Sequence, residues 1–202
     1  MFEPSIIVAF ITGVLGPIIV LVVKHYLDKY KKSDIVADTL ITSEKITNKL
    51  EHIKHEFGAD RVWLTQFHNG GHFYPTGKSI AKFSMVYETV EAGVKSIQSS
   101  FQNIPVSLFS KSINTLLENN VIEIPDFKDE SVATYGLKYI AEESECKSAY
   151  YFAIKTIDER FIGVISVEYT KRKTKLDQES INHLANHATA IGGVLNTHLH
   201  KN

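Results

Sequence analysis

The sequence predicts an α+β domain, an antiparallel sheet flanked by helices, preceded by one N-terminal transmembrane helix. Three observations lead to this prediction. Residues 6–23 contain no charged side chain. Several later segments alternate apolar and polar residues at the period of a strand. Residues 42–57 and 176–199 space their apolar side chains at the period of a helix. The order of these elements favours helices packed on one side of the sheet.

The composition excludes some classes of protein. The 202 residues carry 22 Lys and Arg against 23 Asp and Glu, a formal net charge of −1. No basic excess is present to neutralise phosphates, so we expect no nucleic-acid partner. Cys146 is the single cysteine. An intramolecular disulfide and a multi-cysteine metal site are therefore excluded.

The apolar run of residues 6–23 predicts a membrane anchor, assigned as residues 1–23. As a helix, 18 residues extend about 27 Å, close to the roughly 30 Å hydrocarbon core. A cleaved signal peptide would begin with basic residues, whereas MFEPS is acidic. A buried core helix would usually show a polar face. The residues that mark the anchor are Ile6, Ala9, Gly13, Pro17 and Val23.

Basic residues follow the anchor directly, at Lys24, Lys29, Lys31 and Lys32. Since positive residues stay cytoplasmic, we expect an inner or plasma membrane protein that crosses once, with its N-terminus outside. Residues 24–41 are predicted to form a connecting helix. From Val36 to Phe57 a heptad-like seam recurs at steps of three and four, weak in its first half and apolar in its second. This seam either supports a two-fold contact or packs on the protein's own sheet.

The soluble body is predicted from local patterns. Strands are expected at 61–67, 81–90, 121–124, 148–156 and 161–169. A turn is expected at 68–71, where Asn-Gly-Gly occurs. Helices are expected at 105–119, near 136–143 and at 176–199.

These elements resemble the GAF domain family over roughly residues 42–197, with 198–202 as a tail. The resemblance rests on the order of VIEIPD, KSAYYFAIKTIDERFIGVISVEYT and KTKLDQESINHLANHATAIGGVL. Ser148, Asp158 and Gly163 fall where the family has a serine-led strand, a short hairpin and an apolar strand with an early glycine. The loop HNGGHFYPTGKS departs from the tight hairpin of many relatives.

The resemblance implies a sensory module that binds a small molecule between the sheet and its loops, and that dimerises through its terminal helices. Most strand aromatics are expected to be core, but alternation places some on the ligand face. His68 and His72 are expected at the rim, although turn histidines are commonly surface residues. The candidate ligand-binding residues are His68, His72, Phe83, Met85, Tyr87, Tyr135, Tyr139, Tyr150 and Phe152.

The sequence shows no catalytic constellation. The loop from Gly71 to Ser79 has five residues between its glycines rather than the four of a phosphate-binding loop, and a strand follows it. His183 and His187 are four residues apart, but two histidines make only half of a metal site. We therefore predict no catalytic residue, no metal and no cofactor beyond an unidentified small molecule.

Three hypotheses for function result. The first is a membrane-anchored cytosolic sensory module whose output comes from a protein partner or from self-association. The alternative is a non-catalytic structural or interaction scaffold at a bacterial or phage membrane. The third is a small-molecule enzyme. An open pocket with polar groups favours the first, and a pocket filled by Phe83, Tyr87 and Phe152 favours the second.

Overall fold

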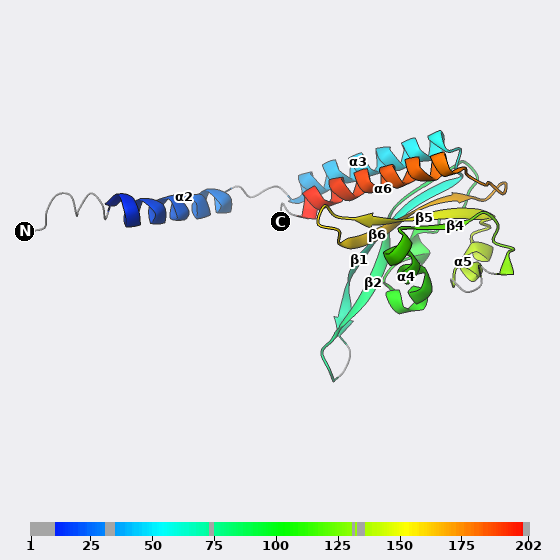
Figure 1. The fold of residues 1–202 in the computed structure, drawn as a ribbon, viewed down its shortest axis with the longest axis horizontal. Coiled ribbons are helices and arrows are strands. Elements are labelled where there is room, and N and C mark those ends of the chain that lie inside the picture. Colours follow the sequence, from blue (N-terminus) through cyan, green and yellow to red (C-terminus); the bar gives the residue numbers. More distant parts are fainter. Residues whose placement is uncertain (1–10, 31–34, 73–74, 131, 133–135, 200–202) are drawn as a thin grey trace, which may run out of the picture. The chain divides into compact units, whose positions relative to one another are not determined.

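The computed structural model describes residues 11–30, 35–72, 75–130, 132 and 136–199. The chain divides into two compact units, Met1–Leu40 and Ile41–Asn202. Figure 1 shows the elements of each unit. The predicted start of the domain at residue 42 lies one residue beyond this division.

The first unit is helical where it is described. A π-helical stretch at Ile11–Leu15 contains Gly13 and leads into α2 (Gly16–Tyr30), which contains Pro17 and Val23. Pro17 is the second residue of α2 and follows the π-helical stretch without a break, so proline here removes one helical N–H donor. Ile6 and Ala9 lie outside the described residues. Within the described part of the chain, none of the helices is both long enough and apolar enough to cross a membrane.

The second unit is built on a six-stranded antiparallel sheet in the order β3-β2-β1-β6-β5-β4. The strands are β1 (Arg61–His72), β2 (Ser79–Val90), β3 (Ile104–Pro105), β4 (Val121–Ile124), β5 (Ser148–Lys155) and β6 (Phe161–Tyr169). The α+β prediction with an antiparallel sheet is confirmed. The two-residue strand β3 was not predicted, because its sequence carries no periodic signal.

The predicted turn at residues 68–71 is wrong. The β1–β2 ladder continues past it, from His68↔Lys82 to His72↔Ser79. A β-bulge shifts the register of the ladder between Asn69 and His72. Gly71 has φ +104° there, a backbone conformation that glycine adopts without steric cost. The Asn-Gly-Gly stretch therefore marks a bulge in a long hairpin rather than its tip.

Helices cover both faces of the sheet, which corrects the prediction that they pack on one side (Figure 1). The helix α3 (Ile35–Glu56), through its residues from 41 onward, and α6 (Gln178–Leu199) cover one face. The helix α4 (Ser110–Asn119) and the short α5 (Lys138–Glu143) lie on the other. The burial of β5 and β6 explains this arrangement. Most of their residues are buried on both faces of the sheet, so each face has to be covered by helices.

The face under α3 and α6 holds the larger core. Ile46, Leu50 and Ile53 of α3 are almost fully buried against it. This half of the heptad-like seam therefore packs on the protein's own sheet. Val36 and Leu40, in the first unit, have exposed side chains. Only the second half of the seam is thus used for the core of the sheet domain.

Short helical turns complete the face under α4. A 3-10 turn at Gln98–Ser100 lies between β2 and β3, and another at Val106–Phe109 leads directly into α4. The predicted helix at 105–119 therefore begins with a tighter turn. Asn120 ends α4 in the left-handed conformation, and its N–H donates to the carbonyl of Leu116 at 3.0 Å. This turn directs the chain from α4 into β4.

Candidate ligand-binding site

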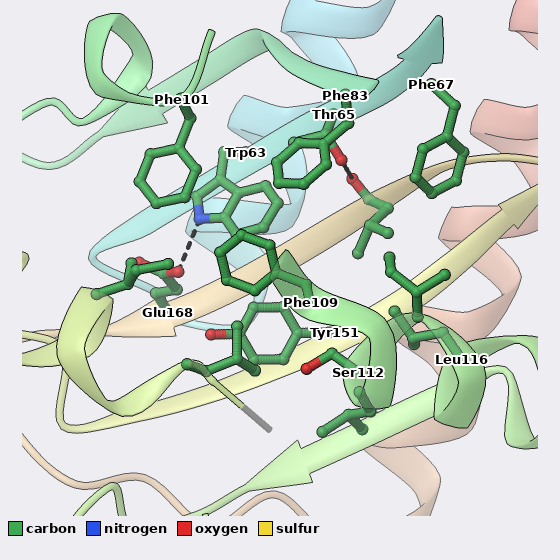
Figure 2. A pocket seen from close by; sticks show the side chains of 15 residues that line it. Trp63, Thr65, Phe67, Phe83, Phe101, Phe109, Ser112, Leu116, Tyr151 and Glu168 are labelled. Atoms are coloured by element: carbon green, nitrogen blue, oxygen red, sulfur yellow. Dashed lines mark hydrogen bonds between the residues drawn. The ribbon is translucent and has the colours of Figure 1, made fainter. Parts of the chain in front are cut away.

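A cavity of about 50 Å³ lies between the sheet and α4. Figure 2 shows the side chains around it, which come from both central and edge strands as well as from α4 and the segments flanking it. The lining residues are Trp63, Thr65, Phe67, Phe83, Phe101, Phe109, Ser112, Ile113, Leu116, Ile122, Leu137, Ile140, Tyr151, Val164 and Glu168. The cavity is therefore mainly aromatic and aliphatic, with a few polar groups.

The floor of the cavity comes from the strands. Trp63, Thr65 and Phe67 are alternate residues of β1 and point to the same face of the sheet, as strand geometry requires. Tyr151 of β5 lies beside Trp63, with ring centroids 5.8 Å apart. The Phe67 ring meets Phe161 edge-on at 4.8 Å. Such edge-on aromatic pairs hold the rings in fixed orientations.

The roof of the cavity comes from α4. Ser112, Ile113 and Leu116 lie within four residues of one another on this helix, and all three line the cavity from its inner face. Phe109, just before the helix, contacts Phe83 of β2 edge-on at 5.6 Å. Leu117, the residue after Leu116, is exposed on the outside of the helix. The helix thus covers the cavity with one face and shows the other to solvent.

One end of the cavity is polar and is organised by Arg61. Its guanidinium is fully buried, and Nη1 donates to Glu168 Oε2 at 2.7 Å. The other carboxylate oxygen of Glu168 accepts a hydrogen bond from the indole Nε1 of Trp63, also at 2.7 Å (Figure 2). Arg61 Nη2 donates to the backbone carbonyls of Lys95, at 2.8 Å, and Ser144, at 3.3 Å. The Arg61 side chain therefore joins strand β6, the segment after β2 and the end of α5.

A second carboxylate, Glu88 of β2, faces the same guanidinium. Glu88 Oε1 lies 3.5 Å from Arg61 Nε. Glu88 also accepts hydrogen bonds from the backbone N–H groups of Ile97, at 2.9 Å, and Gln98, at 3.2 Å. One buried cation thus lies between two carboxylates. Because Glu88 also binds the segment after β2, this arrangement holds that segment beside the cavity.

Burial sets the protonation of the groups around this polar end. It raises the pKa of Glu168, and the hydrogen bonds from Arg61 and Trp63 oppose that rise. Burial also raises the pKa of the Tyr151 phenol and of the Cys146 thiol well above their usual values. At neutral pH the phenol and the thiol are therefore uncharged. The cavity can offer a ligand neutral polar groups beside an internally paired charge.

A larger and more open hollow, of about 470 Å³, lies on the same side of the sheet near α5. Its wall carries charged side chains, including Lys128, Lys138 and Lys147, together with the buried Cys146. Lys173 and Asp126, also in this wall, form an ion pair with each other. The hollow is lined largely by charged residues, unlike the aromatic cavity under α4.

The structure divides the predicted ligand-binding residues of β2 between the two faces of the sheet. Phe83 lines the cavity, and Met85 is buried in the same core without lining it. Tyr87 packs on the opposite core, and its hydroxyl lies 3.1 Å from that of Ser43. The pairing passes from Leu64↔Tyr87 to Thr65↔Met85, so a bulge at Val86 reverses the alternation. Sequence periodicity carries no sign of this bulge.

Tyr150 and Phe152 of β5 both lie in the core under α3 and α6, and neither lines the cavity. The Tyr150 hydroxyl accepts a hydrogen bond from the N–H of Leu176, at 2.8 Å, and donates to the carbonyl of Thr174, at 3.1 Å. The intervening Tyr151 faces the cavity but was not among the predicted residues. Because all three residues are buried, alternation alone could not tell which face each one occupies.

The remaining predicted residues lie away from the cavity lining or outside the description. His68 is partly buried, with Nε2 2.9 Å from the hydroxyl of Ser84. His72 is exposed at the end of β1. Tyr135 lies outside the described residues, and the side chain of Tyr139, in α5, does too. Trp63 and Glu168 line the cavity but were missed as site residues, because a buried ion pair across two strands leaves no local motif.

Solved structures with the same arrangement of sheet and helices provide the comparison. The chain has a GAF-like fold. No protein-family model matches it, and neither does any curated protein sequence. One similar structure is the red/green cyanobacteriochrome NpR6012g4 in its red light-absorbing state, with a TM-score of 0.62 and 15% identity, covering 79% of this chain and 96% of that one.

Two further GAF domains show the same likeness. The phycocyanobilin-bound GAF domain of a cyanobacterial phytochrome has a TM-score of 0.61 and 16% identity over 82% of this chain and 92% of that chain. The PixJ GAF domain of Thermosynechococcus elongatus, in its blue-light absorbing form, has a TM-score of 0.60 and 12% identity over 81% of this chain and 89% of that chain. At such identities the likeness concerns the GAF-like fold.

Proposed function

We propose that this protein is a sensory module that binds a small, mostly apolar molecule in the cavity between the sheet and α4. The observation that carries the proposal is an aromatic cavity with a buried polar end at Trp63 and Glu168. Such a combination is typical of small-molecule sites, in which apolar walls supply affinity and a few polar groups set orientation. The GAF-like neighbours support the same function, since one has biliverdin IXa bound and another phycocyanobilin.

The size of the cavity limits the ligand. About 50 Å³ is far below the roughly 300–1,000 Å³ of sites for drug-sized ligands. It is also smaller than an engineered cavity of about 150 Å³ that binds benzene. We therefore propose a ligand no larger than a single ring, seated after a small outward shift of α4. A bilin is much larger than this space, so we do not extend the ligand of the phytochrome domain to this chain.

The placement of the module at a membrane is the second part of the proposal. It is supported by the sequence, in which the uncharged residues 6–23 are followed by four lysines within residues 24–32. In this arrangement the GAF-like domain lies in the cytoplasm. Val36 and Leu40 are exposed apolar side chains of α3, and they support self-association there. The output would pass to a second copy or to a protein partner.

Trp63 provides the test, because it is the single tryptophan and lines the cavity. The full chain, purified in a mild detergent, is titrated with phenol, p-cresol and cyclohexanol while Trp63 emission is followed with excitation at the red edge of its absorption. We expect at least one probe to change the emission in a saturable manner. Native mass spectrometry of the same sample would show any ligand that co-purifies.

Two substitutions on α4 serve as a matched pair. Ile113→Phe places an aromatic ring in the cavity and is expected to abolish the saturable response. Leu117→Phe adds a similar ring on the exposed side of the same helix and is expected to leave it unchanged. A lack of saturation in the parent chain with every probe, and no co-purified mass, would favour the scaffold alternative. An equal response in both variants would show that the probe binds outside the cavity.

A further inference from the structure

Four potential metal ligands converge where α3 and α6 lie side by side, on the face of the sheet opposite to the cavity (Figure 1). His52 and Glu56 are four residues apart on α3, and His183 and His187 are four apart on α6. Residues at this spacing share one face of their helix. Because each helix supplies one such pair, the packing of α3 against α6 brings the two pairs together.

Glu56 lies at the centre of the cluster. Its Oε2 is 3.4 Å from His52 Nε2 and 3.0 Å from His187 Nε2, and its Oε1 is 3.4 Å from His183 Nδ1. Ligand atoms of His52, Glu56 and His187 all lie within 4.8 Å of one another. In a tetrahedral site with bonds of about 2.0–2.1 Å, neighbouring ligand atoms are about 3.3 Å apart. The distances from Glu56 Oε2 to His52 and His187 are close to this value, whereas His183 faces the other carboxylate oxygen.

The surroundings hold the cluster while leaving it accessible. The imidazoles of His183 and His187 are stacked with centroids 4.9 Å apart, and Phe57 packs edge-on against His183 at 5.7 Å. The side chain of His187 is 15% exposed and that of Glu56 is 28% exposed, whereas His52 is 67% exposed. The inner ligands are therefore fixed by packing, and an ion can enter from the side of His52.

We propose that His52, Glu56 and His187 form a binding site for a divalent transition-metal ion of the zinc class, with His183 beside it against the second carboxylate oxygen of Glu56. Imidazole nitrogen and carboxylate oxygen are ligands that Zn²⁺, Co²⁺ and Ni²⁺ accept in tetrahedral or related geometry. The bound ion joins the helix that opens the sheet domain to the helix that closes it. The site does not depend on the proposed ligand cavity, which lies on the other face of the sheet.

The test uses Co²⁺ as a spectroscopic probe and Zn²⁺ as its competitor, with the full chain in detergent. A tetrahedral Co²⁺ complex gives an absorption band in the visible region, and the band is expected to appear with one ion per chain and to be displaced by Zn²⁺. Zn²⁺ alone is expected to raise the Tm, since an ion that binds only the folded state stabilises it. EDTA should reverse both effects.

Variants of the exposed ligands keep the fold intact while they remove the site. His52→Ala and Glu56→Gln are each expected to remove the Co²⁺ band, and His183→Ala, which loses the contact with the second oxygen of Glu56, to weaken metal binding by on the order of tenfold. His55→Ala is the control, because His55 is on the same helix but pairs with Glu51. Far-ultraviolet circular dichroism verifies the fold of each variant. Absence of both the band and the Tm shift in the parent chain, or equal loss in His55→Ala, would overturn the proposal.

Discussion

Arg61 and Glu168 are direct partners in the β1–β6 ladder, and their side chains form an ion pair at 2.7 Å on the cavity face of the sheet. A charge in such a place is costly unless it is fully paired. Here the pairing is extensive, because Arg61 also meets Glu88 and two backbone carbonyls. The pair therefore fixes both the strand register and the segments that surround the cavity.

The first prediction concerns the two members of this pair. Arg61→Met leaves two buried carboxylates without their cation, and we expect it to lower the free energy of unfolding by about 3–5 kcal/mol. Glu168→Gln should cost less, because the amide oxygen still accepts a hydrogen bond and Arg61 keeps Glu88. Urea unfolding curves measure both values. A larger loss for Glu168→Gln than for Arg61→Met would contradict this account of the site.

The second prediction uses two adjacent glycines of α6. A Cβ on Gly192 would lie 2.1 Å from the carbonyl oxygen of Lys155 in β5, a backbone atom that cannot move alone, whereas a Cβ on Gly193 meets nothing within 4 Å. Gly192→Ala is therefore expected to destabilise the fold by about 1–3 kcal/mol. Gly193→Ala should stabilise it by up to about 1 kcal/mol through helix propensity. Similar effects of both substitutions on urea unfolding would argue against this close helix–strand contact.

The third prediction concerns the accessibility of Cys146. Its thiol is buried, and Sγ lies 3.3 Å from the carbonyl oxygen of Ser148. Because burial raises the pKa of this thiol, almost no thiolate exists in the folded protein at pH 8. We expect a thiol-reactive disulfide reagent to label the native chain very slowly, and to label one thiol per chain once urea unfolds it. Rapid labelling without urea would show that this side of the sheet opens readily.

The fourth prediction concerns alkaline pH. Burial raises the pKa of Tyr169 to about 12, and its hydroxyl donates to the carbonyl of Phe57 at 3.0 Å. Between pH 10 and 12 the unfolded chain loses the phenolic proton while the folded chain keeps it, so the free energy of unfolding falls as pH rises through this window. Tyr169→Phe should make that fall shallower. Urea unfolding at several pH values tests this, and an unchanged slope would count against it.

The secondary structure could be predicted wherever a segment carries one clear sequence pattern. The strand at 121–124 was predicted with its observed bounds, since it is a short apolar run between Asn119-Asn120 and Pro125. The strand at 161–169 was predicted equally well. The placement of helices on both faces was missed. Strands that are apolar on both sides indicate two covered faces, but the amphipathic period of α4 does not say which face it covers.

The site was less predictable for a physical reason. The bulge at Val86 changes which side of β2 each residue faces, and a bulge is decided by the pairing of two strands rather than by one. In β5 both faces are apolar, so the choice between Tyr150 and Tyr151 depends on where β5 sits in the sheet. The convergence of His52 and Glu56 with His183 and His187 likewise requires the packing of two helices that are distant in the sequence.

Consecutive residues of strand β5 face opposite sides of the sheet. Tyr151 touches the cavity, while its neighbours Tyr150 and Phe152 pack beneath α3 and α6. A displacement of Tyr151 by a ligand acts on a backbone whose next Cα atoms, about 3.8 Å away, carry the support of those helices. Under the proposed function, a signal from a bound molecule would therefore cross the thickness of a single strand to reach the opening and closing helices.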